Sequence, residues 1–312
     1  MKPRRVLLVA DVRGWAYDII AKTIAPNFRK YDAEIVYFRE LIDGDDSVDT
    51  NDFDVIFAFF WHDMFLRGGS LGKVDLNKVC VGVHSHNSWL KRGISVSKTS
   101  KILSQYASTG MISRKLYDKF PDIKNRFYTP SGYDPRVFFP RPMPSFGGSL
   151  KVCWAGDPGS SHHGDVKGYN DYIFPVIREM EGVELITASK ENPIRHKDMG
   201  DFYSRGHVYL CFSSNEGTPL PTLEAMACGR PVISTNVGIA PEVIDESNGW
   251  IIPRRIDSLR EALEECFDSM SSLQMMGVNA YKSVEERVSD WSAMYYEKMF
   301  DRVFDSYQEG EK

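Results

Sequence analysis

Two glutamates, Glu216 and Glu224, stand eight positions apart in a stretch whose pattern suits the binding of a phosphorylated ligand. The stretch Ser214–Gly229 reads as a strand end, a Gly/Pro loop, a helix and a tight turn. The first amides of a helix have no partner within the helix, so Gly217, Thr218 and their neighbours offer donors at its positive end. Such donors suit a diphosphate. The two carboxylates could accept hydrogen bonds from sugar and ribose hydroxyls, although either glutamate alone would also fit an ordinary surface position.

The elements that position this stretch are expected to be β-strands, and short apolar runs of strand length recur along the chain. They are Arg5–Ala10, Glu34–Phe38, Phe53–Phe60, Val79–Val83, Leu150–Ala155, Val183–Ile186, Val208–Cys211 and Pro231–Ser234. Helix-like segments fill several intervals, among them Ala16–Arg29, Asn170–Glu181 and Thr222–Cys228. Alternating strands and helices predict an α/β fold with parallel sheets built from βαβ units.

The pattern pauses once, at the Pro- and Gly-rich segment Pro140–Gly148, which is typical of a linker. We therefore expect two Rossmann-like domains, residues 1–145 and 146–290, facing each other across a cleft. Residues 291–312 belong to an aromatic-rich segment that predicts a helix packing back across the domains. Ligands of open parallel sheets bind outside the carboxyl ends of the strands, so the cleft is the expected site.

The stretch around Glu216 and Glu224 resembles the E-x7-E signature of the retaining glycosyltransferases of family 4, whose fold is GT-B. Thr129–Phe138 resembles the family's P-x-G-x-D-x-x-x-F element, and Gly238–Pro253 looks like its next patterned segments. Together these matches cover most of residues 125–255 in the family's order. The N-terminal half is similar to the family only in outline.

The resemblance implies a retaining, metal-independent glycosyltransferase without a cofactor, which moves a sugar from a UDP- or GDP-type nucleotide sugar. It implies catalytic roles for Glu216 beside the donor sugar, for Lys167 on the diphosphate and for His84 near the sugar, with His86 as the second choice. A histidine at a strand end is as often structural. The remaining implied donor-binding residues are Gly14, Gly217, Thr218, Pro219, Leu220 and, on the ribose, Glu224. The departing phosphate would deprotonate the acceptor, so no protein nucleophile is implied.

One departure concerns the diphosphate. Where the family carries an arginine, this sequence has Asp157, and Arg195, Lys197 or His162 are the cations that could replace it. This departure keeps open a nucleotide-sugar or nucleic-acid binding protein that has lost turnover. A GT-B sugar-nucleotide epimerase is a third alternative, which the Glu216/Glu224 spacing disfavours.

The charge distribution bears on the acceptor. Residues 1–147 contain 22 Lys and Arg against 16 Asp and Glu, whereas the rest of the chain contains 16 against 27. A basic cluster spans residues 91–126, and its members Lys91, Arg92, Lys98 and Lys101 are the candidate acceptor-binding residues. The cluster suits an anionic acceptor, namely a lipid phosphate, a membrane surface or a nucleic acid, although a solvated helix face would have the same composition.

Other features are assigned no chemistry. Asp43–Asp46 and His162–His163 carry metal-ligand residue types, but their settings do not predict a metal site. The five cysteines are scattered and read as reduced and structural. The apolar run Val6–Ala10 is too short for a signal peptide, and no stretch reaches the ~18–20 apolar residues of a membrane span. We expect a cytoplasmic protein, with peripheral attachment to a membrane as an option.

Overall fold

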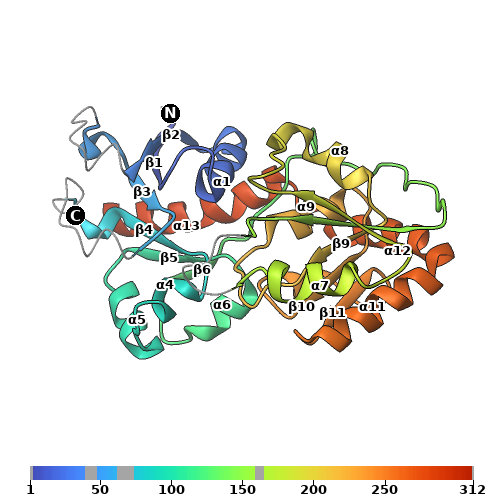
Figure 1. Ribbon diagram of the computed structural model, residues 1–312. Helices are drawn as coiled ribbons and strands as arrows, with labels where there is room; N and C mark the ends of the chain where they lie inside the picture. Colours follow the sequence, from blue (N-terminus) through green and yellow to red (C-terminus); the bar gives the residue numbers. More distant parts are fainter. Residues whose placement is uncertain (1–2, 39–47, 62–73, 159–164, 311–312) are drawn as a thin grey trace. The chain divides into compact units, whose positions relative to one another are not determined.

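A computed structural model describes residues 3–38, 48–61, 74–158 and 165–310. The chain forms two compact units (Figure 1). Unit 1 comprises Met1–Gly132 and Ser289–Lys312, and unit 2 comprises Tyr133–Val288. Each unit is built on one parallel β-sheet, as the alternating pattern predicted.

The described strands of unit 1 form a sheet in the order β2-β1-β3-β4-β5-β6, with every pair parallel. They are β1 (Arg4–Ala10), β2 (Tyr31–Tyr37), β3 (Val55–Ala58), β4 (Val79–Val83), β5 (Ser108–Met111) and β6 (Arg126–Tyr128). The helices between them include α1 (Ala16–Ile24), α4 (Asn87–Leu90), α5 (Val96–Leu103) and α6 (Arg114–Lys119). Strands β3 and β4 are buried along their whole length, as expected for the centre of a parallel sheet covered on both faces.

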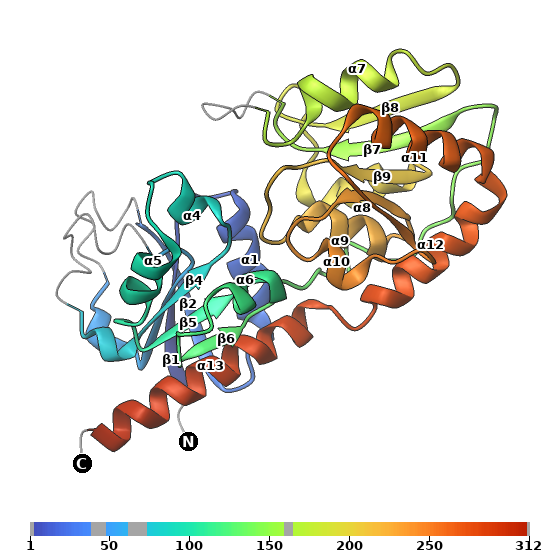
Figure 2. The same ribbon diagram turned by 90° about the horizontal axis from the view of Figure 1, so that it is seen from below.

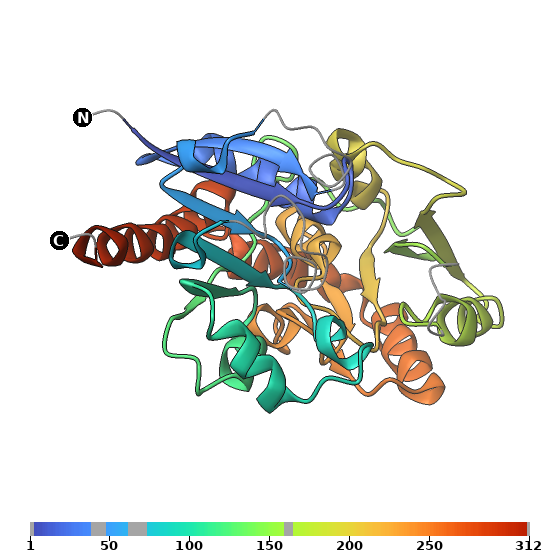
Figure 3. The same ribbon diagram turned by 90° about the vertical axis from the view of Figure 1, so that its left-hand side faces the viewer.

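The C-terminal helix α13 (Ser289–Gly310) returns to unit 1, where it lies along the sheet and contacts α1 (Figures 2 and 3). Its buried apolar residues recur at helical spacing, which explains the aromatic pattern of this segment. They are Ala293, Tyr296, Met299, Phe300 and Val303. Helix α13 is therefore part of the core of unit 1.

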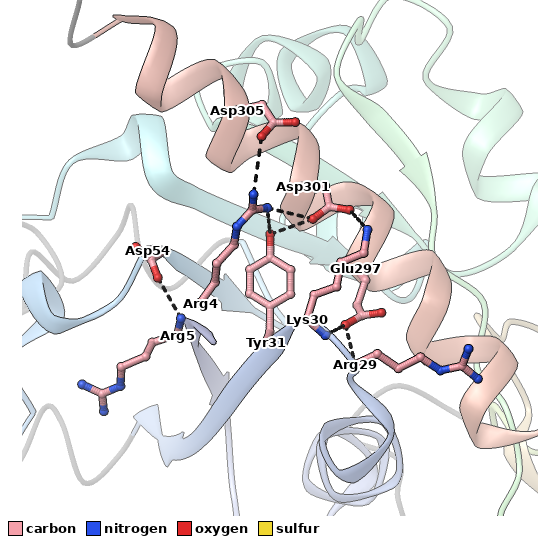
Figure 4. Close-up of polar contacts among 9 residues, drawn as sticks. All are labelled: Arg4, Arg5, Arg29, Lys30, Tyr31, Asp54, Glu297, Asp301 and Asp305. Atoms are coloured by element: carbon pink, nitrogen blue, oxygen red, sulfur yellow. Dashed lines mark hydrogen bonds and ion pairs between the residues drawn. The ribbon is translucent and has the colours of Figure 1, made fainter. Parts of the chain in front are cut away.

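Polar contacts fix α13 to β1, to β2 and to the residues directly before β2 (Figure 4). The buried carboxylate of Glu297 accepts hydrogen bonds from the backbone amides of Arg29 and Lys30, both at 2.7 Å. One turn later, Asp301 pairs with Arg4 at 3.0 Å and with Lys30 at 2.5 Å. These contacts join the two chain segments that make up unit 1.

The described strands of unit 2 form a parallel sheet in the order β11-β10-β9-β7-β8. They are β7 (Leu150–Ala155), β8 (Val183–Ala188), β9 (Val208–Cys211), β10 (Val232–Thr235) and β11 (Gly249–Ile252). The helices are α7 (Phe174–Ile177), α8 (Met199–Ser204), α9 (Leu220–Ala227), α10 (Ala240–Val243), α11 (Ile256–Asp268) and α12 (Met270–Val284). One hydrophobic layer packs α8, α9 and α10 against the sheet, and a second layer packs α7 and α11.

The units divide at residues 132 and 288, rather than at residues 145 and 290 as the sequence suggested. The expected linker Pro140–Gly148 lies within unit 2, where buried Arg230 donates to the carbonyl oxygens of Arg141 and Pro142 at 2.9 and 2.8 Å. Prolines lack an amide donor but keep their carbonyl acceptor, so a side-chain donor can dock such a segment onto a domain.

Candidate functional site

The order in which the chain adds strands to the parallel sheet of unit 2 reverses between β7 and β9. Strand β7 pairs with β8 on one side and with β9 on the other, so the loops that follow β7 and β9 diverge at the carboxyl edge of the sheet. Lys167 lies in the first loop and Glu216 in the second. Lys167 Nζ is 2.6 Å from Glu216 Oε1, and Ser213 Oγ donates to the same oxygen at 2.8 Å. The topology thus brings together two of the predicted site residues.

The contact with Glu216 favours the charged form of Lys167. Burial lowers the pKa of Lys167, but the attraction and hydrogen bond of Glu216 outweigh burial, and the pKa is raised overall. The side chains of Lys167 and Glu216 are 34% and 14% exposed, so both remain accessible to a ligand.

The loop that carries Lys167 is held close to the end of β9. Gly168 has φ +76°, and a Cβ there would lie 2.5 Å from the carbonyl oxygen of Phe212, so a glycine is required. Arg254, which follows β11, donates to the carbonyl oxygens of Asp165 and Phe212 at 2.5 and 3.2 Å. Sequence reasoning missed Arg254, because its partners are backbone atoms far away in the chain.

The start of α9 offers hydrogen-bond donors directly after Glu216. Within the described residues, the amides of Gly217, Thr218 and Leu220 have no partner, and neither has the hydroxyl of Thr218. Pro219 stands at the N-cap of the helix and has no amide donor. Behind the loop, a Cβ on Gly238 would lie 2.2 Å from the carbonyl oxygen of Gly217, so the two backbones touch. Four of the predicted donor-binding residues, Gly217, Thr218, Pro219 and Leu220, are thus consecutive at the start of α9.

Glu224 lies in the second turn of α9 and is 6% exposed. Tyr203 on α8 donates its hydroxyl to Oε2 at 2.7 Å, and Nε2 of His196 lies 3.4 Å from Oε1. Hydrogen bonding to Glu224 raises the pKa of His196, against the opposing effect of burial. Neither partner was predicted, since both come from the segment after β8 and no local spacing marks them.

The position after β7 where the family carries an arginine holds an aspartate, which forms an ion pair with a lysine. The carboxylate of Asp157, after β7, lies 2.5 Å from the ammonium of Lys190, after β8. Of the replacement cations that we considered, Arg195 pairs with Asp198 at 2.6 Å, Lys197 is exposed, and His162 falls outside the described residues.

In unit 1, His84 follows β4 and is buried beside the rings of Tyr17 and Phe59, with centroids 5.0 and 5.7 Å away. Burial lowers the pKa of His84 to about 3, so its imidazole is neutral. Neither ring nitrogen has a hydrogen-bond partner among the residues that the structure describes. Its runner-up, His86, contacts Trp89 at a ring distance of 5.2 Å.

The turn after β1 contains Gly14, with φ +78°. Its amide donates to the buried carboxylate of Asp18 at 2.6 Å. Lys22 and Tyr37 donate to the same carboxylate at 2.8 and 2.7 Å. The carboxylate therefore anchors the turn to the start of α1.

The basic cluster lies on the segments after β4. All four candidate acceptor-binding residues, Lys91, Arg92, Lys98 and Lys101, are exposed, and the neighbouring Leu90 is 60% exposed. From Val79 to Tyr117 the chain carries six Lys and Arg residues and no Asp or Glu. This surface of unit 1 is therefore strongly basic.

Both segments that carry metal-ligand residue types, Asp43–Asp46 and His162–His163, fall outside the described residues. Among the residues that are described, no group of three or more His, Cys, Asp or Glu side chains could hold a metal ion. All five cysteines are buried thiols. In the described part of the chain, no helix has the length and apolar character needed to cross a membrane.

Comparison with solved structures settles the fold. Sucrose-phosphate synthase from Thermosynechococcus elongatus superposes with a TM-score of 0.72 and 14% identity, over 97% of this chain and 100% of that one. Anabaena HepE, in a complex with UDP and glucose, gives a TM-score of 0.68 and 12% identity, over 95% and 99% of the two chains. The chain has the GT-B fold. The predicted fold class is thereby confirmed.

Sequence comparison places the relationship in unit 2. Residues 191–283 match the family model described as Glycosyl transferases group 1, and this range contains both Glu216 and Glu224. One subunit of the phosphatidylinositol N-acetylglucosaminyltransferase of Homo sapiens is 30% identical over 112 residues, which cover 35% of this chain and 23% of that protein. The matched region therefore covers less than a quarter of that relative's length. The chain has glycosyltransferase homologues.

Proposed function

We propose that this chain is a retaining, metal-independent glycosyltransferase of the family 4 type, which binds a nucleotide sugar in unit 2. The Lys167–Glu216 pair carries the proposal, because Lys167 is paired with the carboxylate that directly precedes Gly217 and Thr218, whose amides have no partner among the described residues. A cation and a helix start suit a diphosphate, and a carboxylate suits sugar hydroxyls. The match of residues 191–283 to the group 1 glycosyltransferases supports this assignment.

The donor is a UDP- or GDP-type sugar, and no cofactor takes part. The HepE structure is a complex with UDP and glucose, which favours UDP. When the bond between sugar and phosphate breaks, negative charge grows on the diphosphate. Lys167 and the amides of Gly217 and Thr218 would stabilise that charge, which a divalent cation does in metal-dependent transferases.

The configuration of the sugar is retained if the acceptor hydroxyl attacks from the face that the phosphate leaves. The departing phosphate oxygen then takes the proton of that hydroxyl. The protein then supplies no nucleophile. Glu216 orients the donor sugar, and Glu224 accepts hydrogen bonds from the ribose. The resemblance also gives His84 a place near the sugar, and its buried imidazole is neutral.

Unit 1 presents the acceptor in this proposal. Its exposed basic residues Lys91, Arg92, Lys98 and Lys101 suit an anionic acceptor, and the exposed Leu90 beside them suits a lipid surface at the cytoplasmic face of a membrane. The human relative is named for phosphatidylinositol, which favours a lipid phosphate over a nucleic acid. An acceptor KM that rises steeply with added salt is the expected result, and a KM independent of salt would contradict it.

A second candidate function is nucleotide-sugar binding without turnover. The observation that favours it is Asp157, whose carboxylate stands where a diphosphate-binding arginine is expected and is paired with Lys190. A carboxylate near a diphosphate weakens binding by repulsion unless its partner cation compensates.

Thermal unfolding with UDP, GDP, ADP, CDP and dTDP tests the donor site. A nucleotide at ~100 times its Kd should add about 2.7 kcal/mol of stability, and no shift with any of them would overturn the site.

Sugar conjugates of the active nucleotide are then offered with lipid-phosphate acceptors. Transfer that is lost in Glu216→Ala and kept in Glu264→Ala, an exposed glutamate on α11, supports the transferase. Binding without transfer or donor interconversion supports the second candidate.

A further inference from the structure

The buried carboxylate of Glu224 is held by two side chains from opposite directions. Tyr203, which is completely buried, donates to Oε2 from the core, whereas His196 is 38% exposed and lies against Oε1 from the solvent side. The ring of Phe138 packs edge-on against the His196 imidazole, with centroids 5.3 Å apart. The position of His196 on Glu224 is thus fixed by packing as well as by charge.

The two protein donors leave Glu224 with spare acceptor capacity. An ionised carboxylate can accept about four hydrogen bonds, and Tyr203 and His196 occupy two of these positions. The remaining capacity matches the two adjacent hydroxyls of a ribose. A 2′-deoxyribose would leave one position without a donor.

The negative charge of Glu224 must also be compensated. A carboxylate that is 6% exposed needs a compensating cation, above all beside an anionic diphosphate. His196 is the ionisable base in contact with Glu224. On the neighbouring segments, Arg195 is already paired with Asp198, and Arg136 with Asp134.

We propose that His196 is a positioning residue for the nucleotide: it holds Glu224 in place for the two ribose hydroxyls, and its positive charge is required for tight binding of a ribonucleoside diphosphate. This inference rests on the proposed function, since it assumes that a nucleotide binds in unit 2.

The groups around His196 make its charge sensitive to pH. Glu224 faces it from α9, and Asp134 faces it from the segment after β6; both favour the imidazolium. Tyr203 stays neutral, because burial raises its pKa far above the usual range. The pKa of His196 is therefore raised, the imidazolium persists to higher pH than in an ordinary histidine, and it is lost as the pH increases further. Nucleotide affinity should fall over the same range.

Calorimetric titration of the full chain with UDP and GDP, at pH 6.0, 7.0 and 8.5, tests the inference. The key variant is His196→Gln, whose amide keeps an N–H donor for Glu224 but does not titrate. For the nucleotide that binds, the wild type should lose affinity about tenfold more than His196→Gln between pH 6.0 and 8.5, which is the size of one charged hydrogen bond. The titration of the nucleotide itself cancels in this comparison. Arg205→Gln, which removes an exposed cation at the end of α8, should behave as the wild type.

Three further results decide between interpretations. Discrimination against dUDP or dGDP that is weaker in His196→Gln than in the wild type supports the inference. Equal affinity and equal pH dependence of wild type and His196→Gln overturn it, while the proposed function stands because the nucleotide still binds. Failure of the wild type to bind either nucleotide at any pH overturns both.

Discussion

The ammonium of Lys167 and the carboxylate of Glu216 lie 2.6 Å apart, although 49 positions separate them in the chain. The strands that precede them, β7 and β9, are neighbours at the point where the strand order of unit 2 reverses. If Lys167 binds the diphosphate, Lys167→Gln should weaken UDP or GDP binding about 10- to 100-fold, the range expected for one charged hydrogen bond. Isothermal titration measures the change.

The stability of the same variant serves as its control. The pair is partly open to solvent, so breaking it should lower the free energy of unfolding by about 1 kcal/mol or less. Glu216→Gln should retain nucleotide binding but lose transfer, because the glutamate orients the sugar. Unchanged nucleotide affinity in Lys167→Gln would remove this lysine from the donor site.

A second prediction concerns Gly238, which supports the loop of Glu216 from behind. It has φ +51°, and a Cβ there would come within 2.2 Å of the carbonyl oxygen of Gly217. Gly238→Ala should therefore cost about 1–3 kcal/mol of stability through backbone strain, and it should also weaken nucleotide binding by displacing the amides of Gly217 and Thr218. Gly147→Ala is the matched control, since a Cβ at Gly147 meets nothing within 4 Å. Normal nucleotide affinity in Gly238→Ala would show that the loop position does not matter for binding.

The sequence predicted the strands best where they are apolar runs. Val79–Val83, Leu150–Ala155 and Val208–Cys211 have the predicted bounds. By contrast, β5 (Ser108–Met111) has the sequence Ser-Thr-Gly-Met, which carries no apolar run, and it is nevertheless fully buried. Its neighbours β4 and β6 make it a strand, and such tertiary context is not visible in a local pattern.

For the site, the local stretch from Glu216 to Glu224 was proposed from its loop and helix signals, and Lys167 from the family resemblance, since it precedes a helix-like run. The residues that position these site residues could not be predicted. Arg254 acts on two carbonyl oxygens, and His196 acts on a side chain from another element. Contacts of this kind depend on the packing of α8 and α9 and on the order of the strands, which sequence spacing does not encode.

The pH dependence of unit 1 should reflect Asp18, the anchor of the Gly14 turn. Burial disfavours its ionisation, but hydrogen bonds from Lys22, the amide of Gly14 and Tyr37 outweigh burial and lower the pKa. A lowered folded-state pKa means that the carboxylate stabilises the fold above about pH 4, and that this contribution is lost as the pH falls through the folded-state value.

Urea unfolding at pH 7.0, 5.0 and 3.0 checks this prediction. Asp18→Asn should be less stable than the wild type by about 2 kcal/mol at pH 7.0, and the difference should shrink towards pH 3.0. Asp32→Asn, an exposed position on β2, should show no such trend. A difference that stays constant with pH would mean that the shape of Asp18, rather than its charge, anchors the turn.

The last prediction concerns the return of α13 to unit 1. Glu297 is 5% exposed, and its Oε1 accepts the amides of Arg29 and Lys30, which precede β2. Glu297→Ala leaves two backbone donors without an acceptor in a buried place, so it should lower the free energy of unfolding by about 3 kcal/mol. Glu297→Gln keeps one acceptor oxygen and should lose less. Asp305→Asn breaks only a 3.9 Å pair with Arg4 in which the aspartate is 62% exposed, and it should change stability by less than about 0.5 kcal/mol. If urea unfolding gave Glu297→Ala the stability of Asp305→Asn, the packing of Tyr296, Phe300 and their apolar neighbours alone would hold the helix in place.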